Sequence, residues 1–176
     1  GTDMRTGSAL EIYRSGVGRC GEEAVFVVNV MRSAGIPARP VYVPRWSHCD
    51  DNHAWVEVWC DGDWHYLGAC EPEAVLDKSW FTNAASRAMM IGSRWYDRAM
   101  PDEKVIGKDG MNRIINLLGK YAKTRWITIT VEDLDGTPAA GAKVRAEVMN
   151  YGEFSPIAIM EADKNGCISF ETGFGS

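Results

Sequence analysis

The sequence lacks the features of a membrane-spanning or nucleic-acid-binding protein. No apolar run approaches the roughly 20 residues that a membrane-spanning helix needs, and the start carries no signal-peptide pattern. Basic residues form no block, and 19 of them against 24 acidic residues give a formal net charge of -5. We therefore expect no nucleic-acid partner. The chain opens on Gly1 rather than on Met, and we expect it to be an excised piece of a longer protein.

Cysteine is present, but not in a spacing typical of metal or redox sites. The cysteines form no C-x-x-C motif, and their odd number leaves at least one of them unpaired or paired between chains. They are Cys20, Cys49, Cys60, Cys70 and Cys167. A zinc-binding module is a minor alternative, because His48, Cys49 and His53 are suitable zinc ligands, but a second close ligand pair is missing. We expect no metal and no cofactor.

The first part of the chain mixes helix and strand patterns. Residues 20–34 repeat apolar side chains every three or four positions, which predicts a helix that ends at Gly35. Residues 39–43 and 53–60 predict strands, and the second of these alternates strictly. Asp61-Gly62 is a hairpin signal, and residues 64–69 predict the returning strand. Further on, we expect a loop and helix over residues 77–91 and a helix over residues 111–120.

The character of the sequence changes at about Thr124. Short β-branched segments at residues 126–131, 143–149, 157–160 and 168–170 alternate with turn clusters, which predicts an all-β segment. We predict an α+β protein with a first domain over residues 1–123 and a small β-sandwich segment over residues 124–176. Three or four short strands rarely bury enough apolar surface to fold alone, so we expect this sandwich to be incomplete or covered by the first domain.

Cys20 has the surroundings that a nucleophilic thiol needs. A reactive cysteine must be ionised, and a helix N-terminus or a neighbouring imidazolium lowers its pKa. Cys20 lies where the first predicted helix begins, and Gly21 after it leaves backbone N–H groups accessible as oxyanion donors. His53 begins a strand after a polar loop, on the side opposite the apolar face of that strand, which suits a base. Contact between the two residues depends on the fold.

Four ordered blocks of sequence resemble the core of the transglutaminase-like superfamily. They are residues 18–23 (GRCGEE), 32–39 (RSAGIPAR), 53–58 (HAWVEV) and 62–64 (GDW). The resemblance covers roughly residues 15–75, and the chain is also similar to an uncharacterised bacterial branch of the superfamily. It implies a papain-like core, in which a helix with the nucleophile at its N-terminus packs on an antiparallel sheet. It also implies Cys20 as nucleophile and His53 as base.

The sequence departs from this family at the acid that orients the base. The family places an Asp four residues after the hairpin tryptophan, and here that position is Gly68. Glu71 is the nearest acid, but a shift of three positions in a strand reverses the face, so only a bulge or turn would re-aim it. Asp50 and Asp51 are rivals from the loop before His53. We favour Glu71 as the third member of the site.

The expected function is thiol-dependent acyl transfer on peptide or protein amides, and we expect hydrolysis of the peptidase or amidase type. Trp46 and Trp55 are expected to wall the pocket that Cys20 and Gly21 form. The alternative is a binding or scaffold module whose thiol site has decayed, which Gly68 supports. The pattern does not indicate the substrate or the oligomeric state.

The turn cluster at residues 133–138 gives the β segment a resemblance to carboxypeptidase-regulatory-like or transthyretin-like sandwiches. Such modules usually support or bind rather than catalyse. They are frequent in surface and periplasmic proteins, so we expect an extracytoplasmic location in a bacterium.

Overall fold

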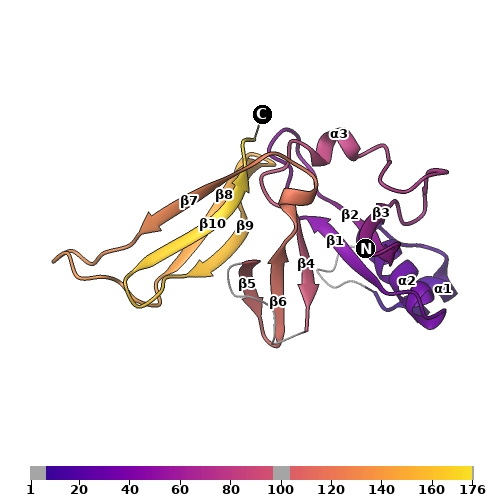
Figure 1. Cartoon of the computed structure of the whole chain (residues 1–176), viewed down its shortest axis with the longest axis horizontal. Coiled ribbons are helices and arrows are strands. Elements are labelled where there is room, and N and C mark those ends of the chain that lie inside the picture. The colour runs from indigo at the N-terminus through magenta and orange to yellow at the C-terminus, as the bar shows by residue number, and fades with distance from the viewer. Residues whose placement is uncertain (1–6, 97–103, 176) are drawn as a thin grey trace. The chain divides into compact units, whose positions relative to one another are not determined.

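The structure is a computed structural model that describes residues 7–96 and 104–175 (Figure 1). It is α+β, with mostly antiparallel strands and few helices, as the sequence predicts. Internal contacts divide the chain into two compact units. The first unit holds residues 1–42 and 53–82, and the second holds residues 43–52 and 83–176. Residues 83–123 thus group with the β segment, while the domain boundary at residue 124 stays a prediction.

The first unit begins with two helices. The shorter, α1 (Ala9–Ser15), has a capping box in which Ser8 and Glu11 satisfy each other's backbone N–H groups, and Gly16 ends it with a φ of 65°. The longer, α2 (Cys20–Ser33), confirms the predicted helix and its start. The helix α1 packs against α2, where the rings of Tyr13 and Phe26 stack at 6.5 Å. The sequence patterns do not predict α1, which is short and buries no residue.

Three strands of the first unit lie in the order β3-β2-β1. They are β1 (Ala38–Val43, of which Val43 groups with the second unit), β2 (His53–Cys60) and β3 (Asp63–Leu67). The strands β2 and β3 form the predicted antiparallel hairpin, with positive φ at Asp61 and Gly62, which a tight two-residue turn requires. The helix α2 packs on one face of β2 through a cluster that includes Ala24, Val28 and Val56. His53, Trp55 and Glu57 alternate with Val56 along β2 and therefore point to its opposite face.

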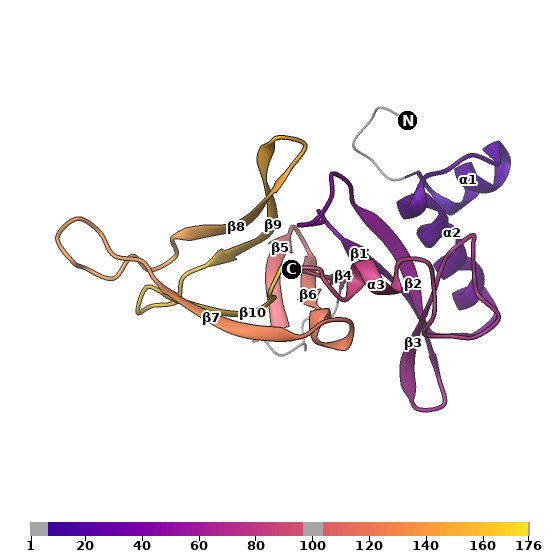
Figure 2. The same ribbon diagram turned by 90° about the horizontal axis from the view of Figure 1, so that it is seen from above.

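The second unit is built mainly from strands. One group has β6 (Asn112–Asn116) between β4 (Gly92–Trp95) and β5 (Val105–Asp109), all antiparallel. Two further ribbons pair β7 (Thr124–Thr130) with β10 (Cys167–Gly173) and β8 (Lys143–Asn150) with β9 (Glu153–Glu161) (Figure 2). Apolar side chains from both ribbons and from β5 share one core cluster, which includes Val148, Met160, Ile168, Phe170 and Ile106.

One predicted helix is wrong. Residues 111–120 form β6 and the 3₁₀ helix Leu118–Lys120 instead of an α-helix. The apolar residues at 114 and 115 fit either pattern, but β6 gains hydrogen bonds from strands on both sides, so tertiary pairing decides. The loop and helix predicted over residues 77–91 contain the four-residue helix α3 (Thr82–Ala85). The four strands predicted after Thr124 are confirmed as β7 to β10.

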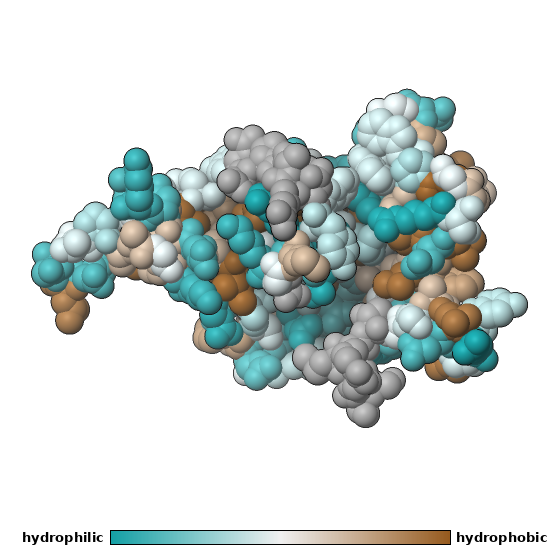
Figure 3. All heavy atoms as spheres, turned by 90° about the horizontal axis from the view of Figure 1, so that it is seen from below, coloured by the Kyte–Doolittle hydropathy of each residue, from teal (hydrophilic) through white to brown (hydrophobic). Residues whose placement is uncertain are grey.

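Among the described residues, none of the helices has the length and apolar character to cross a bilayer. On the face drawn in Figure 3, hydrophobic residues are scattered among hydrophilic ones. Single exposed apolar side chains of this kind are normal for a folded protein.

Candidate functional site

Cys20 is the first residue of α2 and is half-buried. The residue before it, Arg19, is extended, with φ -95° and ψ 172°, and the Glu22 carboxylate accepts a hydrogen bond from the Arg19 N–H at 2.6 Å. The same bond is the main cause that lowers the pKa of Glu22. A side chain added at Gly21 would meet nothing within 4 Å, so the backbone beside Cys20 faces open space. The first turn of α2 thus offers accessible N–H groups and a positive dipole end beside the thiol.

His53, the first residue of β2, lies in a cage of aromatic rings. Only 7% of its surface is exposed, and its Nε2 atom is buried. The imidazole centroid is 5.9 Å from the Trp55 ring, 4.7 Å from the Trp80 ring and 4.9 Å from the Phe81 ring. Trp55 is fully buried and stacks on Phe81 at 4.8 Å. The cage fixes the plane of the imidazole, which a general base requires.

Glu71 lies in the space that a side chain at position 68 would fill. A Cβ atom built on Gly68 would be 2.8 Å from the Glu71 carbonyl oxygen and 3.0 Å from Glu71 Oε1. The strand β3 ends at Leu67, so the chain turns at once and carries Glu71 back beside Gly68. This turn removes the face reversal that a continuous strand would impose on a residue three positions on. The Glu71 carboxylate also accepts a hydrogen bond from Trp80 Nε1 at 3.3 Å.

The same loop reaches the first turn of α2 through Cys70. Burial is the main cause that raises the pKa of the Cys70 thiol, followed by the charges of Glu23 and Glu71 and a hydrogen bond with the Glu23 side chain. Glu23 is three residues after Cys20, so the two share one face of the helix. Residues 68–71 therefore contact both the helix turn that carries Cys20 and, through Glu71 and Trp80, the aromatic cage of His53.

Asp77 anchors the segment between β3 and α3. Its carboxylate lies 2.5 Å from His65 Nδ1 and accepts a hydrogen bond from the Tyr66 N–H at 2.9 Å. The Tyr66 hydroxyl donates to the Asp77 carbonyl at 2.6 Å, and the Asp77 N–H donates back to the Tyr66 carbonyl at 3.0 Å. Asp77 has a φ of 59°, a left-handed conformation that Asp tolerates better than most residues. These contacts tie Trp80 and Phe81 to β3.

Residues 43–52, which include the loop before His53, belong to the second unit. Trp46 is almost fully buried and packs on His48, with ring centroids 5.3 Å apart, and burial lowers the pKa of His48. The Asp50 carboxylate accepts a hydrogen bond from the Tyr151 N–H at 2.6 Å, and the Asp51 carboxylate accepts one from the Asn52 N–H at 2.8 Å. The carboxylates of both rival acids thus accept hydrogen bonds from backbone N–H groups. The pocket role of Trp46 stays a prediction.

Asn150 holds that loop from about 100 residues away, and no motif in the sequence predicts this role. Asn150 is fully buried, and its Nδ2 donates to the backbone carbonyls of Trp46 at 3.0 Å, Cys49 at 2.9 Å and Asp51 at 3.4 Å. The sequence gives one clue, because Asn-Tyr-Gly at residues 150–152 forms the turn between β8 and β9. This turn signal does not indicate that the Asn150 side chain binds the loop before His53.

The described residues offer no converging ligand set for a metal. Within residues 7–96 and 104–175, no three His, Cys, Asp or Glu side chains are grouped so that they could hold an ion. The zinc alternative built on His48, Cys49 and His53 therefore gains no support from the fold.

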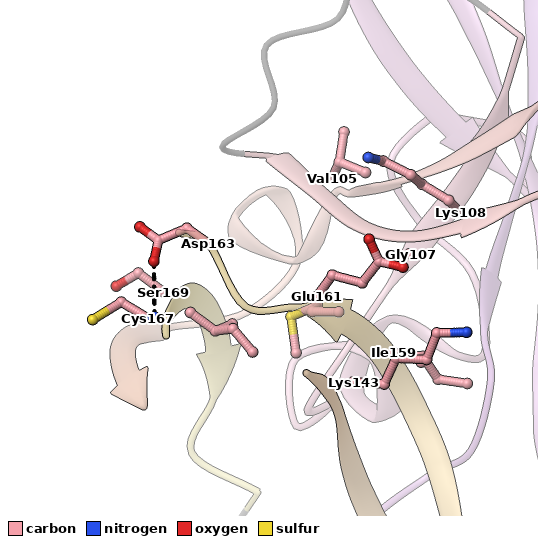
Figure 4. Close-up of a pocket in the computed structure, with 11 residues that line it drawn as sticks. Val105, Gly107, Lys108, Lys143, Ile159, Glu161, Asp163, Cys167 and Ser169 are labelled. Carbon is pink, nitrogen blue, oxygen red and sulfur yellow. Dashed lines mark hydrogen bonds between the residues drawn. The ribbon is translucent and has the colours of Figure 1, made fainter. Parts of the chain in front are cut away.

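A separate cavity of about 400 Å³ lies in the second unit (Figure 4). Its charged lining residues are Lys108, Lys143, Glu161 and Asp163, and the Asp163 carboxylate accepts a hydrogen bond from the Cys167 N–H at 2.9 Å. Two positive and two negative groups favour no ligand charge, and all four side chains are exposed. Cys20, His53 and Glu71 do not line this cavity.

These features define an α+β unit in which a helix begins at a cysteine and packs on an antiparallel strand that begins at a histidine. Residues 1–69 match the family model of the transglutaminase-like superfamily, which confirms the resemblance for this segment. The match ends before Glu71. Neither the curated proteins nor the solved structures contain a significant match to the chain.

Proposed function

We propose that this protein catalyses thiol-dependent acyl transfer on peptide or protein amides, with Cys20 as nucleophile, His53 as base and Glu71 as the acid that orients the base. The superfamily match over residues 1–69 supports the reaction class. The observation that carries the proposal is the 68–71 loop. Its Cys70 contacts the first turn of α2 at Glu23, and its Glu71 bonds to Trp80, which packs on His53.

The proposed reaction has two halves. The Cys20 thiolate attacks the amide carbonyl, and backbone N–H groups beside Gly21 stabilise the oxyanion. The C–N bond breaks as the His53 imidazolium gives its proton to the leaving amine, which leaves a thioester on Cys20. A water molecule, deprotonated by His53, then attacks the thioester, and the acid and the Cys20 thiolate are released. For these steps we expect the papain-like arrangement that the resemblance implies to bring Cys20 and His53 together, with Glu71 beside His53.

We infer hydrolysis rather than transfer to an amine, because the resemblance is to bacterial members of the superfamily that are mostly regarded as peptidase-like. The substrate class is a peptide or protein amide.

Selective alkylation of Cys20 tests the proposal. We expect iodoacetamide to label Cys20 at about pH 6, where an ordinary thiol is less than about 1% ionised. Cys70 serves as an internal control, because its raised pKa keeps it protonated. The His53→Ala variant should lose the low-pH labelling and keep the labelling at about pH 9.5, where every accessible thiol reacts. Slow labelling of all accessible cysteines without preference, in wild type and variant alike, would overturn the proposal.

The alternative is a catalytically impaired binding or scaffold module. The glycine at position 68, where the family has its acid, favours it. The two functions separate in the Glu71→Gln variant. Loss of the orienting acid slows an active triad, so a several-fold lower Cys20 reactivity at about pH 6 favours the enzyme. Identical reactivity in the two proteins favours the scaffold.

We also propose a location outside the bacterial cytoplasm. Its support is the resemblance of residues 124–176 to modules that are frequent in surface and periplasmic proteins. Fractionation of cells that carry the full gene tests it, and recovery of the protein in the cytoplasmic fraction alone would contradict it.

A further inference from the structure

The Trp80 side chain is largely exposed to solvent but is held in place by its neighbours. Its surface is 63% exposed, yet three neighbours hold the indole. The ring centroid lies 4.7 Å from that of His53 at an interplanar angle of 54°, the Phe81 ring meets it edge-on at 5.7 Å and 87°, and the indole N–H donates to Glu71 at 3.3 Å. A tryptophan that served only the core would bury its ring. The contacts of Trp80 instead lead to the proposed base and the proposed acid.

We propose that Trp80 is a positioning residue of the thiol site, whose indole N–H fixes the Glu71 carboxylate while its ring covers the His53 imidazole. This inference rests on the proposed function. It gives Trp80 a role in holding His53 and Glu71 in the geometry that acyl transfer requires.

Glu71 needs such an anchor because it lies on a loop. A residue within a strand has its direction fixed by the ladder of backbone hydrogen bonds, but β3 ends at Leu67. Two contacts replace that constraint, namely the close approach to Gly68 and the hydrogen bond from Trp80. A carboxylate has about four acceptor sites, so a bond from the indole leaves capacity for a second donor. Cys70 on the same loop is influenced by the charges of both Glu71 and Glu23.

The ring of Trp80 adds a second contact to the base, because its centroid lies 4.7 Å from that of the imidazole. An aromatic ring within about 6 Å of a cation stabilises that cation, so this ring stabilises the imidazolium that the proposed mechanism forms on His53. In an active Cys–His pair the imidazolium accompanies the reactive thiolate. Loss of Trp80 should therefore slow the alkylation of Cys20 at low pH and leave it unchanged at high pH.

The test compares alkylation of Cys20 at two pH values in the full chain. Trp80→Phe keeps an aromatic ring and removes the N–H, and we expect its Cys20 rate to fall about fivefold at about pH 6 and to stay within about twofold at about pH 9.5. Glu71→Gln removes the carboxylate that the indole positions and should give at least as large a change. The double variant should then show little further loss, because the indole N–H acts through that carboxylate. Trp59→Phe is the matched control, since Trp59 is also exposed but packs on Trp64.

The outcomes separate this inference from the function on which it rests. If wild-type Cys20 reacts selectively at low pH and Trp80→Phe has the same ratio of rates, the positioning role is refuted while the proposed function stands. If wild-type Cys20 shows no selectivity, both fail. An additive loss in the double variant would also contradict the role, because it would mean that Trp80 acts independently of Glu71. Thermal unfolding of each variant confirms that the compared proteins are folded. If Trp80→Phe does not fold, Trp80→Tyr replaces it.

Discussion

Introduction of the family's acid at position 68 should harm this protein rather than improve it. The φ of Gly68 is not positive, so the backbone itself accepts any residue. The obstacle is space, because a Cβ atom would lie 2.8 Å from the Glu71 carbonyl oxygen and 3.2 Å from its carbon. Ordinary contacts begin at about 3.5 Å. The atoms in the way are backbone, so the whole 68–72 turn must move to relieve the overlap.

Two opposing terms set the expected size of the change. Replacement of glycine by alanine stabilises a compatible site by about 0.4–1 kcal/mol, because the unfolded chain loses freedom. Overpacking of a fixed site costs about 1–3 kcal/mol. The close contact with backbone makes the second term the larger, so Gly68→Ala should lower the free energy of unfolding by about 1–2 kcal/mol. Gly68→Asp should cost more, because its carboxylate adds a like charge beside Glu71.

Urea unfolding of the two variants, together with Cys20 alkylation at about pH 6, provides the assay. Gly119→Ala is the matched control, since a Cβ there first meets the end of the Glu171 side chain at 3.4 Å and should change stability by less than about 0.5 kcal/mol. The reasoning is refuted if Gly68→Ala is as stable as wild type. It is refuted equally if Gly68→Asp makes Cys20 more reactive, since position 68 would then accept the family's acid.

Three further substitutions test the contacts that hold each unit together. Asn150→Ala removes the buried amide that donates to three carbonyls of the 46–51 loop, and of these only the Cys49 and Asp51 carbonyls keep a backbone donor. It should cost about 1–3 kcal/mol in urea unfolding, and an unchanged midpoint would contradict this. Glu57→Gln breaks a buried ion pair, in which the fully buried Glu57 lies 2.5 Å from Arg39, and should cost about 3–5 kcal/mol, a loss that must appear at low and high salt alike. Glu22→Gln should cost less than about 1 kcal/mol at neutral pH. Because the folded-state pKa of Glu22 is lowered, this difference should vanish as pH falls through that pKa, and a constant difference down to about pH 2 would exclude a charge effect.

The fold was predictable from the sequence wherever its determinants are local. The start of α2 at Cys20 and the hairpin at Asp61-Gly62 follow from helix and turn signals within a few residues. The helix predicted over residues 111–120 is wrong because the structure of this segment depends on distant residues. Its apolar residues suit either structure, and hydrogen bonds from distant strands selected β6.

The sequence by itself determined the two ends of the proposed chemistry, a cysteine at a helix start and a histidine at a strand start, because caps, periodicity and motif order lie along the chain. It also showed that Gly68 stands where an acid is expected. Only the tertiary structure showed how Glu71 comes to fill that space and how Trp80 joins it to His53. The physical reason is that β3 stops at Leu67 and the chain then folds back under contacts such as the Asp77–Tyr66 pair, which no local pattern encodes.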